Sequence, residues 1–187
     1  MLSIEQISDR LELQQLVTDY VNALDARAFD RLDRVFTPDA HIDYTAMGGI
    51  AGPYPKIKAW LPEALKHFPA YMHFIGNLSF EIRGDTATGQ IACFNPMVIP
   101  KVAGDTGPER SEAGAGAGES VASRTHSRSA RNTVSATDGG TDTMFLGLWY
   151  HDRYVRTPQG WRIAERSESK CYDFNMPDWM KKALKMV

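Results

Sequence analysis

The stretch Tyr71-Met72-His73-Phe74-Ile75-Gly76-Asn77 decides the fold, because its pattern predicts the strand around which the other elements can be placed. Side chains alternate between the two faces of a strand, but the apolar positions of this segment change parity after Gly76. A β-bulge at Gly76-Asn77 would correct the parity, since bulges favour glycine. One buried face would then carry His73, Ile75, Leu78 and Phe80. We therefore expect His73 to be a polar group inside an apolar wall.

The composition is that of an ordinary globular protein. The chain has 187 residues, of which 43% are hydrophobic, and a net charge of −2, which suits one domain spanning residues 1–187. This charge argues against a nucleic-acid surface, and no apolar run approaches the length of a membrane span. The first residues lack a signal peptide's basic and apolar regions, and neither Cys93 nor Cys171 lies in a CxxC pair. We expect a cytoplasmic protein without nucleic-acid or membrane partners.

Apolar residues at helical spacing predict three helices ahead of the central strand. These helices are expected at residues 4–24, about 30–36 and about 56–68. Ser3 can cap the first helix, Thr37-Pro38 ends the second, and Pro62 bends the third or shifts its start. Tyr20 lies on the apolar side of the first helix, and Asp25 follows the end of that helix.

The segment His41-Ile42-Asp43-Tyr44 alternates like a short strand, which places His41 and Asp43 on one face. Both side chains are of metal-ligating types, but two ligands are too few for a site. We therefore expect a solvated strand face there and no metal.

The second half of the chain predicts a sheet interrupted by an insertion. Strands are expected at residues 71–83, 86–100, 143–157 and 161–167, followed by a helix at 177–186. Residues 101–141 are rich in Gly, Ala and Ser and have almost no large apolar side chain, so we expect a disordered insertion. The element order predicts an α+β fold with helices on one face of a curved antiparallel sheet. Such a sheet leaves a conical pocket beside the first helix, toward which Tyr20, Asp25 and His73 would point.

Four motifs carry a family resemblance. They are Leu13-x-x-Leu16-x-x-x-Tyr20-x-x-x-Leu24-Asp25, Phe36-Thr37-Pro38-Asp39-Ala40, His73-Phe74-Ile75-Gly76-Asn77, and Tyr150-x-Asp152-x-Tyr154-x-Arg156 leading into Gly160-Trp161-Arg162-Ile163. Together they resemble the SnoaL-like branch of the nuclear transport factor 2-like superfamily over nearly the whole chain except residues 101–141. The resemblance implies a cystatin-like roll.

The pair Asp25 and His73 resembles the dyad of three lyases of this branch: scytalone dehydratase, bile-acid 7α-dehydratase and hexachlorocyclohexane dehydrochlorinase. In those lyases the histidine takes a proton from carbon, and the aspartate orients and charges the histidine. Tyr20 resembles the tyrosine of the bile-acid enzyme, and Arg166 resembles a polar pocket residue of the dehydrochlorinase. His151 is the candidate for the second pocket histidine of the scytalone enzyme.

The residue types agree with this chemistry. A lone histidine in a strand is more often a core residue, but with a partner a neutral imidazole of ordinary pKa, about 6.5, is a competent base. A carboxylate on the other ring nitrogen fixes the tautomer, and a tyrosine hydroxyl can donate where negative charge develops. None of these roles requires a metal or an organic cofactor, so we expect neither.

The pocket wall is expected to be apolar, with Trp60, Phe74, Phe94, Phe145 and Trp149 as candidates. The predicted substrate-binding residues are Arg166, Tyr44, Trp60, Phe94, Trp149 and His151. Tyr172 and Phe174 either cross the pocket mouth or pack the last helix against the sheet.

These features predict a cofactor-independent lyase, a dehydratase or a related elimination enzyme, acting on a small hydrophobic ring-containing substrate. An isomerase or cyclase with the same base, or a non-catalytic pocket for an apolar small molecule, would fit the same residues. The resemblance also implies a homo-oligomer, a trimer or a dimer. The strand at 143–156 is apolar on both faces, which calls for a cover from another subunit or from the C-terminal segment.

Overall fold

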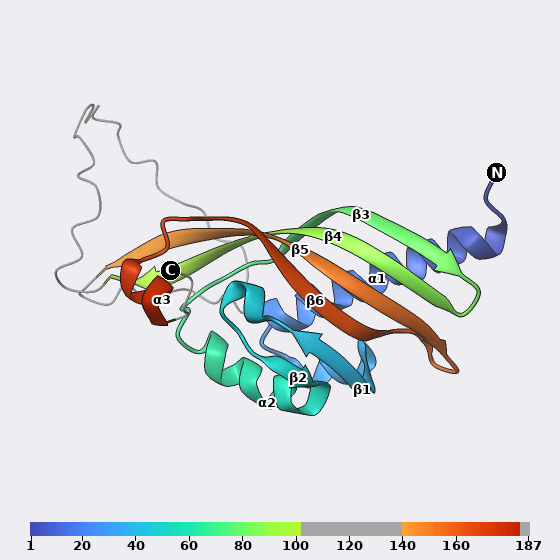
Figure 1. Cartoon of the computed structure of the whole chain (residues 1–187), viewed down its shortest axis with the longest axis horizontal. Helices are drawn as coiled ribbons and strands as arrows, with labels where there is room; N and C mark the ends of the chain where they lie inside the picture. The colour runs from blue at the N-terminus through green and yellow to red at the C-terminus, as the bar shows by residue number, and fades with distance from the viewer. Residues whose placement is uncertain (102–139, 184–187) are drawn as a thin grey trace, which may run out of the picture.

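The computed structural model describes residues 1–101 and 140–183 (Figure 1). The helical elements are α1 (Ile4–Asp25), η1 (Phe29–Arg34), η2 (Thr45–Met47), α2 (Tyr54–Leu65) and α3 (Asp178–Ala183). The strands are β1 (Phe36–Asp43), β2 (Ala51–Pro53), β3 (Phe74–Arg83), β4 (Thr86–Pro100), β5 (Thr141–Thr157) and β6 (Gly160–Phe174). The insertion predicted at residues 101–141 lies outside the described residues except at its ends.

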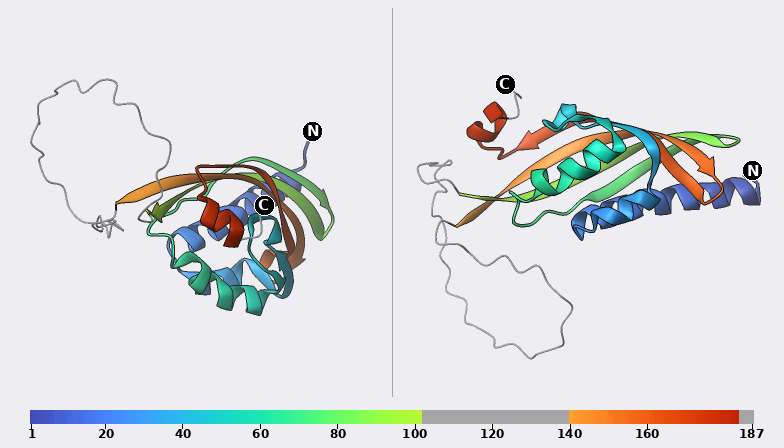
Figure 2. Two further views of the ribbon diagram at one scale, coloured as in Figure 1. Left: turned by 60° about the vertical axis from the view of Figure 1, so that its left-hand side comes forward. Right: turned by 90° about the horizontal axis from the view of Figure 1, so that it is seen from below.

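The chain folds as a curved sheet with helices on its concave side. The strand order is β2-β1-β6-β5-β4-β3, and α1 and α2 lie together on the concave face of the sheet (Figure 2). The pairs β3–β4, β4–β5 and β5–β6 are antiparallel, as the hairpin pattern predicts. The α+β fold is therefore confirmed. Among the described residues, no helix is long and apolar enough to cross a membrane.

The sheet is mixed, which corrects the prediction of a wholly antiparallel one. β1 pairs parallel to β6, and it begins at Phe36 rather than near His41. Thr37-Pro38, expected to end a helix, lies within this strand. The register between β1 and β6 shifts between Phe36 and His41, and such an irregularity tolerates a proline that has no N–H to donate.

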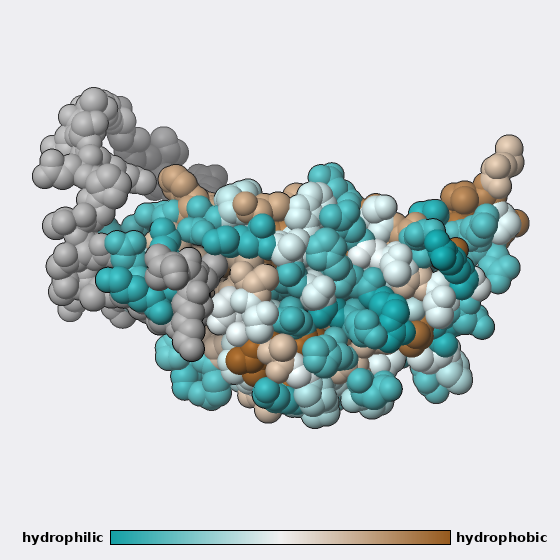
Figure 3. Space-filling model, viewed as in Figure 1, coloured by the Kyte–Doolittle hydropathy of each residue, from teal (hydrophilic) through white to brown (hydrophobic). Residues whose placement is uncertain are grey.

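Helix α1 begins as its sequence predicts. Ser3 and Gln6 form a reciprocal capping box, with the Gln6 N–H donating to Ser3 Oγ at 3.2 Å and the Ser3 N–H donating to Gln6 Oε1 at 2.9 Å. The apolar stripe, however, is buried only from the third turn onward. Ile4 and Leu11 are 87% and 62% exposed, because the N-terminal end of α1 projects beyond the sheet, where hydrophobic residues gather at the surface (Figures 1 and 3).

The bulge predicted in the central strand is present. The register between β3 and β4 shifts between Gly76 and Ser79, and Asn77 has a φ of 48°. The shift turns Phe80 inward, where it is 9% exposed, whereas Phe74 is 69% exposed on the opposite face. The His73 side chain, just ahead of β3, is 6% exposed. The extra residue of the bulge therefore places His73 on the same side of the sheet as the core.

Candidate functional site

A cavity of about 640 Å³ lies between α1, α2 and the concave face of the sheet. Most of its wall is aliphatic, from Leu24, Leu61, Leu65, Met97, Met144 and Leu148. Its polar groups are Tyr20, Tyr44, His67, His73, Asn95 and Glu168. A mostly apolar cavity with a few converging polar groups is the usual form of a small-molecule site.

The histidine and the aspartate meet at one side of this cavity. His73 Nδ1 lies 2.7 Å from Asp25 Oδ1. The backbone N–H of His73 also donates to the Asp25 carboxylate, at 3.2 Å to Oδ1 and 3.0 Å to Oδ2. Asp25 is the last residue of α1 and His73 directly precedes β3, so the contact joins the helix to the sheet. These three contacts place the Nδ1 proton on the side of the carboxylate and leave Nε2 as the unprotonated ring nitrogen, which accepts hydrogen bonds.

Asn95 is a member of this group that the sequence pattern did not single out. Its Nδ2 lies 3.1 Å from His73 Nε2, and its side-chain oxygen is buried without a hydrogen-bond partner among the described residues. Alternation along β4 was the available signal, because Asn95 shares the inward face with Cys93 and Met97. A polar side chain at a buried position of an apolar strand usually has a specific partner.

Two tyrosines form a second polar centre in the same cavity. The hydroxyls of Tyr20 and Tyr44 lie 2.8 Å apart, and the two residues are 1% and 5% exposed. Burial raises the pKa of Tyr20 to about 12 and holds the pKa of Tyr44 well above its ordinary value. Both hydroxyls therefore stay protonated at neutral pH, so one of them can donate to a ligand while accepting from the other.

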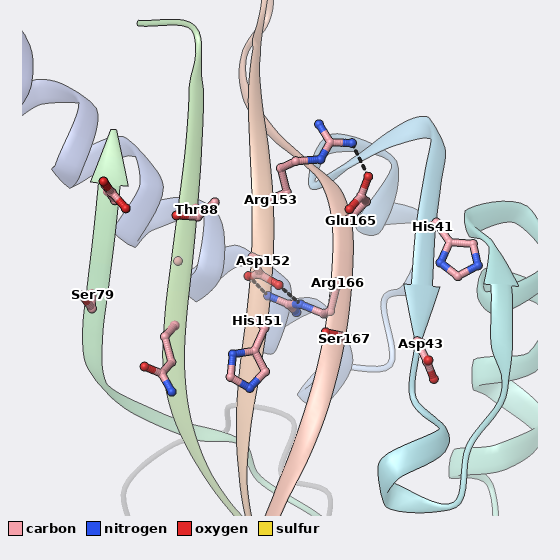
Figure 4. A pocket seen from close by; sticks show the side chains of 13 residues that line it. His41, Asp43, Ser79, Thr88, His151, Asp152, Arg153, Glu165, Arg166 and Ser167 are labelled. Atoms are coloured by element: carbon pink, nitrogen blue, oxygen red, sulfur yellow. Dashed lines mark hydrogen bonds and ion pairs between the residues drawn. The ribbon is translucent and has the colours of Figure 1, made fainter. Parts of the chain in front are cut away.

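Arg166, expected to contact substrate, lies behind this wall instead. Its guanidinium donates to both carboxylate oxygens of Asp152, with distances of 2.7 and 2.6 Å, and neither side chain is exposed (Figure 4). The guanidinium carbon sits over the rings of Tyr20 and Tyr150, 4.0 and 4.3 Å from their centroids. Arg166 therefore packs against the side of the Tyr20 ring that faces away from the cavity. The rings of Tyr20 and Tyr150 separate the guanidinium from the cavity.

Strand alternation places three further predicted site residues on the outer face of the sheet. Leu148 and Tyr150 point into the cavity, so Trp149 and His151 point away from it. Phe94 is 40% exposed and stacks on Phe145 with ring centroids 5.6 Å apart. The prediction that Phe94, Trp149 and His151 bind substrate is therefore wrong for this cavity. Of the predicted substrate-binding residues, Tyr44 and Trp60 line it.

His151 belongs to a polar depression of about 720 Å³ on the outer face, together with His41 and Asp43 (Figure 4). There His151 Nε2 lies 2.7 Å from Ser169 Oγ, and Arg153 forms an exposed ion pair with Glu165. This depression lies on the side of the sheet opposite to His73.

Of the two placements expected for Tyr172 and Phe174, the structure contradicts the one across the pocket mouth. Tyr172 and Phe174 are 49% and 64% exposed and do not line the cavity. A Cβ at Gly147 would lie 2.2 Å from the ring of Tyr172, so Gly147 makes room for that ring on the outer face. Met176 and Met180, which follow β6, line the cavity instead.

Comparisons with known proteins agree with the fold. The SnoaL-like domain model matches residues 5–167. A protein of Mycobacterium tuberculosis (strain ATCC 25618 / H37Rv), itself described as uncharacterized, is 49% identical over 172 residues, which cover 92% of each chain.

Solved structures show the same fold at low identity. A protein from Kribbella flavida is 22% identical with a TM-score of 0.66, over 95% of this chain and 97% of that one. A hexachlorocyclohexane dehydrochlorinase from Novosphingobium barchaimii LL02 is 14% identical with a TM-score of 0.62, over 94% of each chain. A scytalone dehydratase-like protein from Novosphingobium aromaticivorans is 12% identical with a TM-score of 0.60, over 91% and 89% of the two chains. The match to the family model and the 49% identical relative together show that the chain belongs to the SnoaL-like domain family.

Proposed function

We propose that the chain is a cofactor-independent lyase that eliminates water or a similar leaving group from a small, hydrophobic, ring-containing molecule. The observation that carries the proposal is the contact of 2.7 Å between His73 Nδ1 and Asp25 Oδ1 at the wall of an apolar cavity. The dehydrochlorinase and the scytalone dehydratase-like protein share the fold and are named for eliminations, which agrees with this reaction class.

Nε2 of His73 takes a proton from a carbon next to an activating group, such as a carbonyl. Asp25 accepts the Nδ1–H throughout and stabilises the imidazolium that forms. The electron pair of the broken C–H bond becomes the new double bond and expels the leaving group. The amide of Asn95 lies 3.1 Å from Nε2 and must move away before the substrate can approach Nε2. The displaced amide can then form a hydrogen bond with a polar group of the substrate.

One hydroxyl of the Tyr20–Tyr44 pair can donate to the carbonyl oxygen on which charge develops when the proton leaves. This tyrosine pair also supports an isomerase as a second candidate, because the dienolate of a β,γ-unsaturated ketone, stabilised there, can be reprotonated at another carbon without loss of a leaving group. The two candidates share the base and differ only in the fate of the enolate.

A panel of cyclic ketones, some with a hydroxyl at the β-carbon and others with a β,γ double bond, incubated with the protein in D₂O, separates the candidates. A lyase yields the unsaturated ketone with loss of water, which mass spectrometry detects. An isomerase yields a product of unchanged elemental composition that has incorporated solvent deuterium. Saturable binding without turnover of any panel member by the wild-type protein would contradict both and leave a non-catalytic binding pocket.

Replacing Tyr20 by phenylalanine should lower kcat by about a hundredfold or more, because it removes one donor from the site of developing charge. Steady-state kinetics on a panel substrate would measure this change. Tyr54→Phe is a matched control, since the Tyr54 hydroxyl donates to Asp33 outside the cavity. An unchanged kcat in Tyr20→Phe would mean that Tyr20 only packs against Arg166.

We also infer that the protein self-associates through the outer face of the sheet. Phe74, Phe94 and Phe174 are 69%, 40% and 64% exposed on this face, and Phe145 stacks between the latter two. Exposed apolar patches of this kind mark protein interfaces. Because β5 is apolar on both faces, its outer face also needs to be buried, and we infer that a second copy of the chain buries it.

Light scattering at micromolar concentration should therefore report a dimer or a trimer, and Phe94→Glu should shift the mass toward the monomer. Ile4→Glu, which adds the same charge to an exposed apolar position on α1, should not. A monomeric wild-type protein would contradict the inference.

A further inference from the structure

Glu168 is a buried carboxyl group without an assigned role in the cavity. It lies on β6 opposite Tyr150 in the register, and its side chain lines the cavity that holds His73. Its Oε2 is shielded from solvent and has no hydrogen-bond partner among the described residues. Leaving a buried carboxyl oxygen unpaired costs free energy, so a bound ligand is the natural partner for it.

Groups from four strands, from α1 and from the residue before η2 interact with Glu168. Arg166 on β6 attracts a negative charge there, whereas Asp43 on β1 and Asp152 on β5 repel it. Tyr20 of α1, Tyr44 before η2, Tyr150 of β5 and Cys93 of β4 also interact electrostatically with Glu168. Arg166 is already paired with Asp152 through two hydrogen bonds, so it offsets the burial of a second carboxylate only in part.

Burial therefore dominates and raises the pKa of Glu168 from 4.5 to about 8, with the two aspartates adding to the rise and Arg166 opposing it. At pH 7 the folded protein then holds Glu168 mainly as a neutral carboxylic acid. In that form the group is a hydrogen-bond donor through its O–H, and an acceptor such as a hydroxyl or carbonyl oxygen is its complement. The donor is lost as the pH rises past about 8.

Glu168 and His73 approach the cavity from different sides. His73 contacts Asn95 of β4, whereas Glu168 belongs to β6, and β5 lies between these two strands. A ring held against Leu148 and Tyr150 of β5 would therefore meet a base at one edge and an acid at the other. A carboxylic acid and an imidazole at opposite edges of a bound ring are a suitable arrangement for concerted acid and base catalysis.

We propose that Glu168 is the general acid of the elimination and that it donates its proton to the oxygen of the leaving hydroxyl while His73 removes the proton from carbon. This proposal rests on the lyase function proposed above. The C–H electron pair becomes the C=C bond, and the C–O electron pair stays on oxygen, which accepts the Glu168 proton and departs as water. Glu168 is left as a carboxylate and His73 as an imidazolium, and proton exchange with solvent restores both.

A general acid at Glu168 favours one class of substrate. A hydroxyl is a poor leaving group that needs protonation, whereas a phenolate or a halide departs unaided. An acid aimed into the cavity therefore fits a cyclic alcohol, dehydrated to an alkene, better than a halogenated ring.

Glu168→Gln tests the proposal with two leaving groups on one ring, 3-hydroxycyclohexanone and 3-(4-nitrophenoxy)cyclohexanone. We expect the variant to lose about a hundredfold or more in kcat on the alcohol and less than tenfold on the nitrophenyl ether. The wild-type kcat on the alcohol should fall above pH about 8, and the kcat on the ether should not. Glu165→Gln, at an exposed site on the same strand, is the matched control.

Equal losses on both probes, or no loss on either, would overturn the role of Glu168. A wild-type protein that turns over neither probe points instead to a failure of the proposed lyase function for this ring. In that case infrared spectroscopy still decides the state of Glu168. The wild-type minus Glu168→Gln difference spectrum should contain the carbonyl band of a protonated carboxylic acid at pH 7, and this band should disappear as the pH passes about 8. A band that is absent at pH 7 would overturn the proposal.

Discussion

Replacing His73 by alanine should reduce turnover by about 10²- to 10⁴-fold, because it removes the proposed base while leaving the cavity and the tyrosine pair in place. Asp25 would retain the backbone N–H of residue 73 as a donor, so the junction between α1 and β3 should survive the change. Both kcat with a cyclic β-hydroxy ketone and the rate of exchange of its α-proton in D₂O should fall together, since the same proton transfer starts both processes.

His151→Ala is the matched control for this change. His151 lies on the outer face and contacts Ser169, so its removal should leave turnover unchanged. Asp25→Asn should also lower turnover strongly, because an amide can favour the wrong tautomer of the imidazole. Full exchange of the α-proton by folded His73→Ala protein would assign the base to another residue.

Replacing Arg166 by methionine should lower the free energy of unfolding by about 3–5 kcal/mol. The substitution leaves the fully buried Asp152 carboxylate with the Tyr154 hydroxyl, at 2.7 Å, as its remaining side-chain donor in the described structure. For a domain of this size, that loss corresponds to a decrease in Tm of roughly 10 °C. Denaturant unfolding followed by circular dichroism would measure it.

Arg153→Met provides the comparison, since Arg153 forms an exposed pair with Glu165 and should contribute no more than about 1 kcal/mol. In the double variant Arg166→Met/Asp152→Leu the buried charge is gone, so much of the stability should return. A single variant as stable as the wild type would mean that water or a rearranged side chain reaches Asp152.

The sequence pattern was sufficient to predict a structural feature where that feature depends on a single residue or on the apolar periodicity of one segment. Ser3 predicts the start of α1, and the parity change at Gly76 predicts the bulge that turns Phe80 and His73 inward. The approach of Asp25 to His73 was expected from a family resemblance, which carries tertiary information that periodicity alone does not.

The sequence pattern failed to predict which face of a strand points toward the helices where the strand is apolar on both faces. β5 has Leu146 and Leu148 on one side and Phe145 and Trp149 on the other, so alternation gives no preference for which side faces the helices. The assignment of Trp149 to the cavity was wrong for this reason. The parallel pairing of β1 with β6 was missed because it joins residues far apart in the chain, between which no turn signal exists.

The sequence by itself determined the α+β class, the helix that ends at Asp25 and the bulge beside His73, because each depends on the conformational preferences of a few consecutive residues. Only the tertiary structure decided that Arg166 lies behind Tyr20 and that His151 faces outward. It also decided that Asn95 and Glu168 reach the cavity with oxygens that have no hydrogen-bond partner in the described part of the chain. Burial and hydrogen-bond satisfaction are properties of the packed chain. The sequence does not distinguish a carboxyl group on a solvated strand from one inside a cavity. The difference arises only when packed elements exclude water from the group.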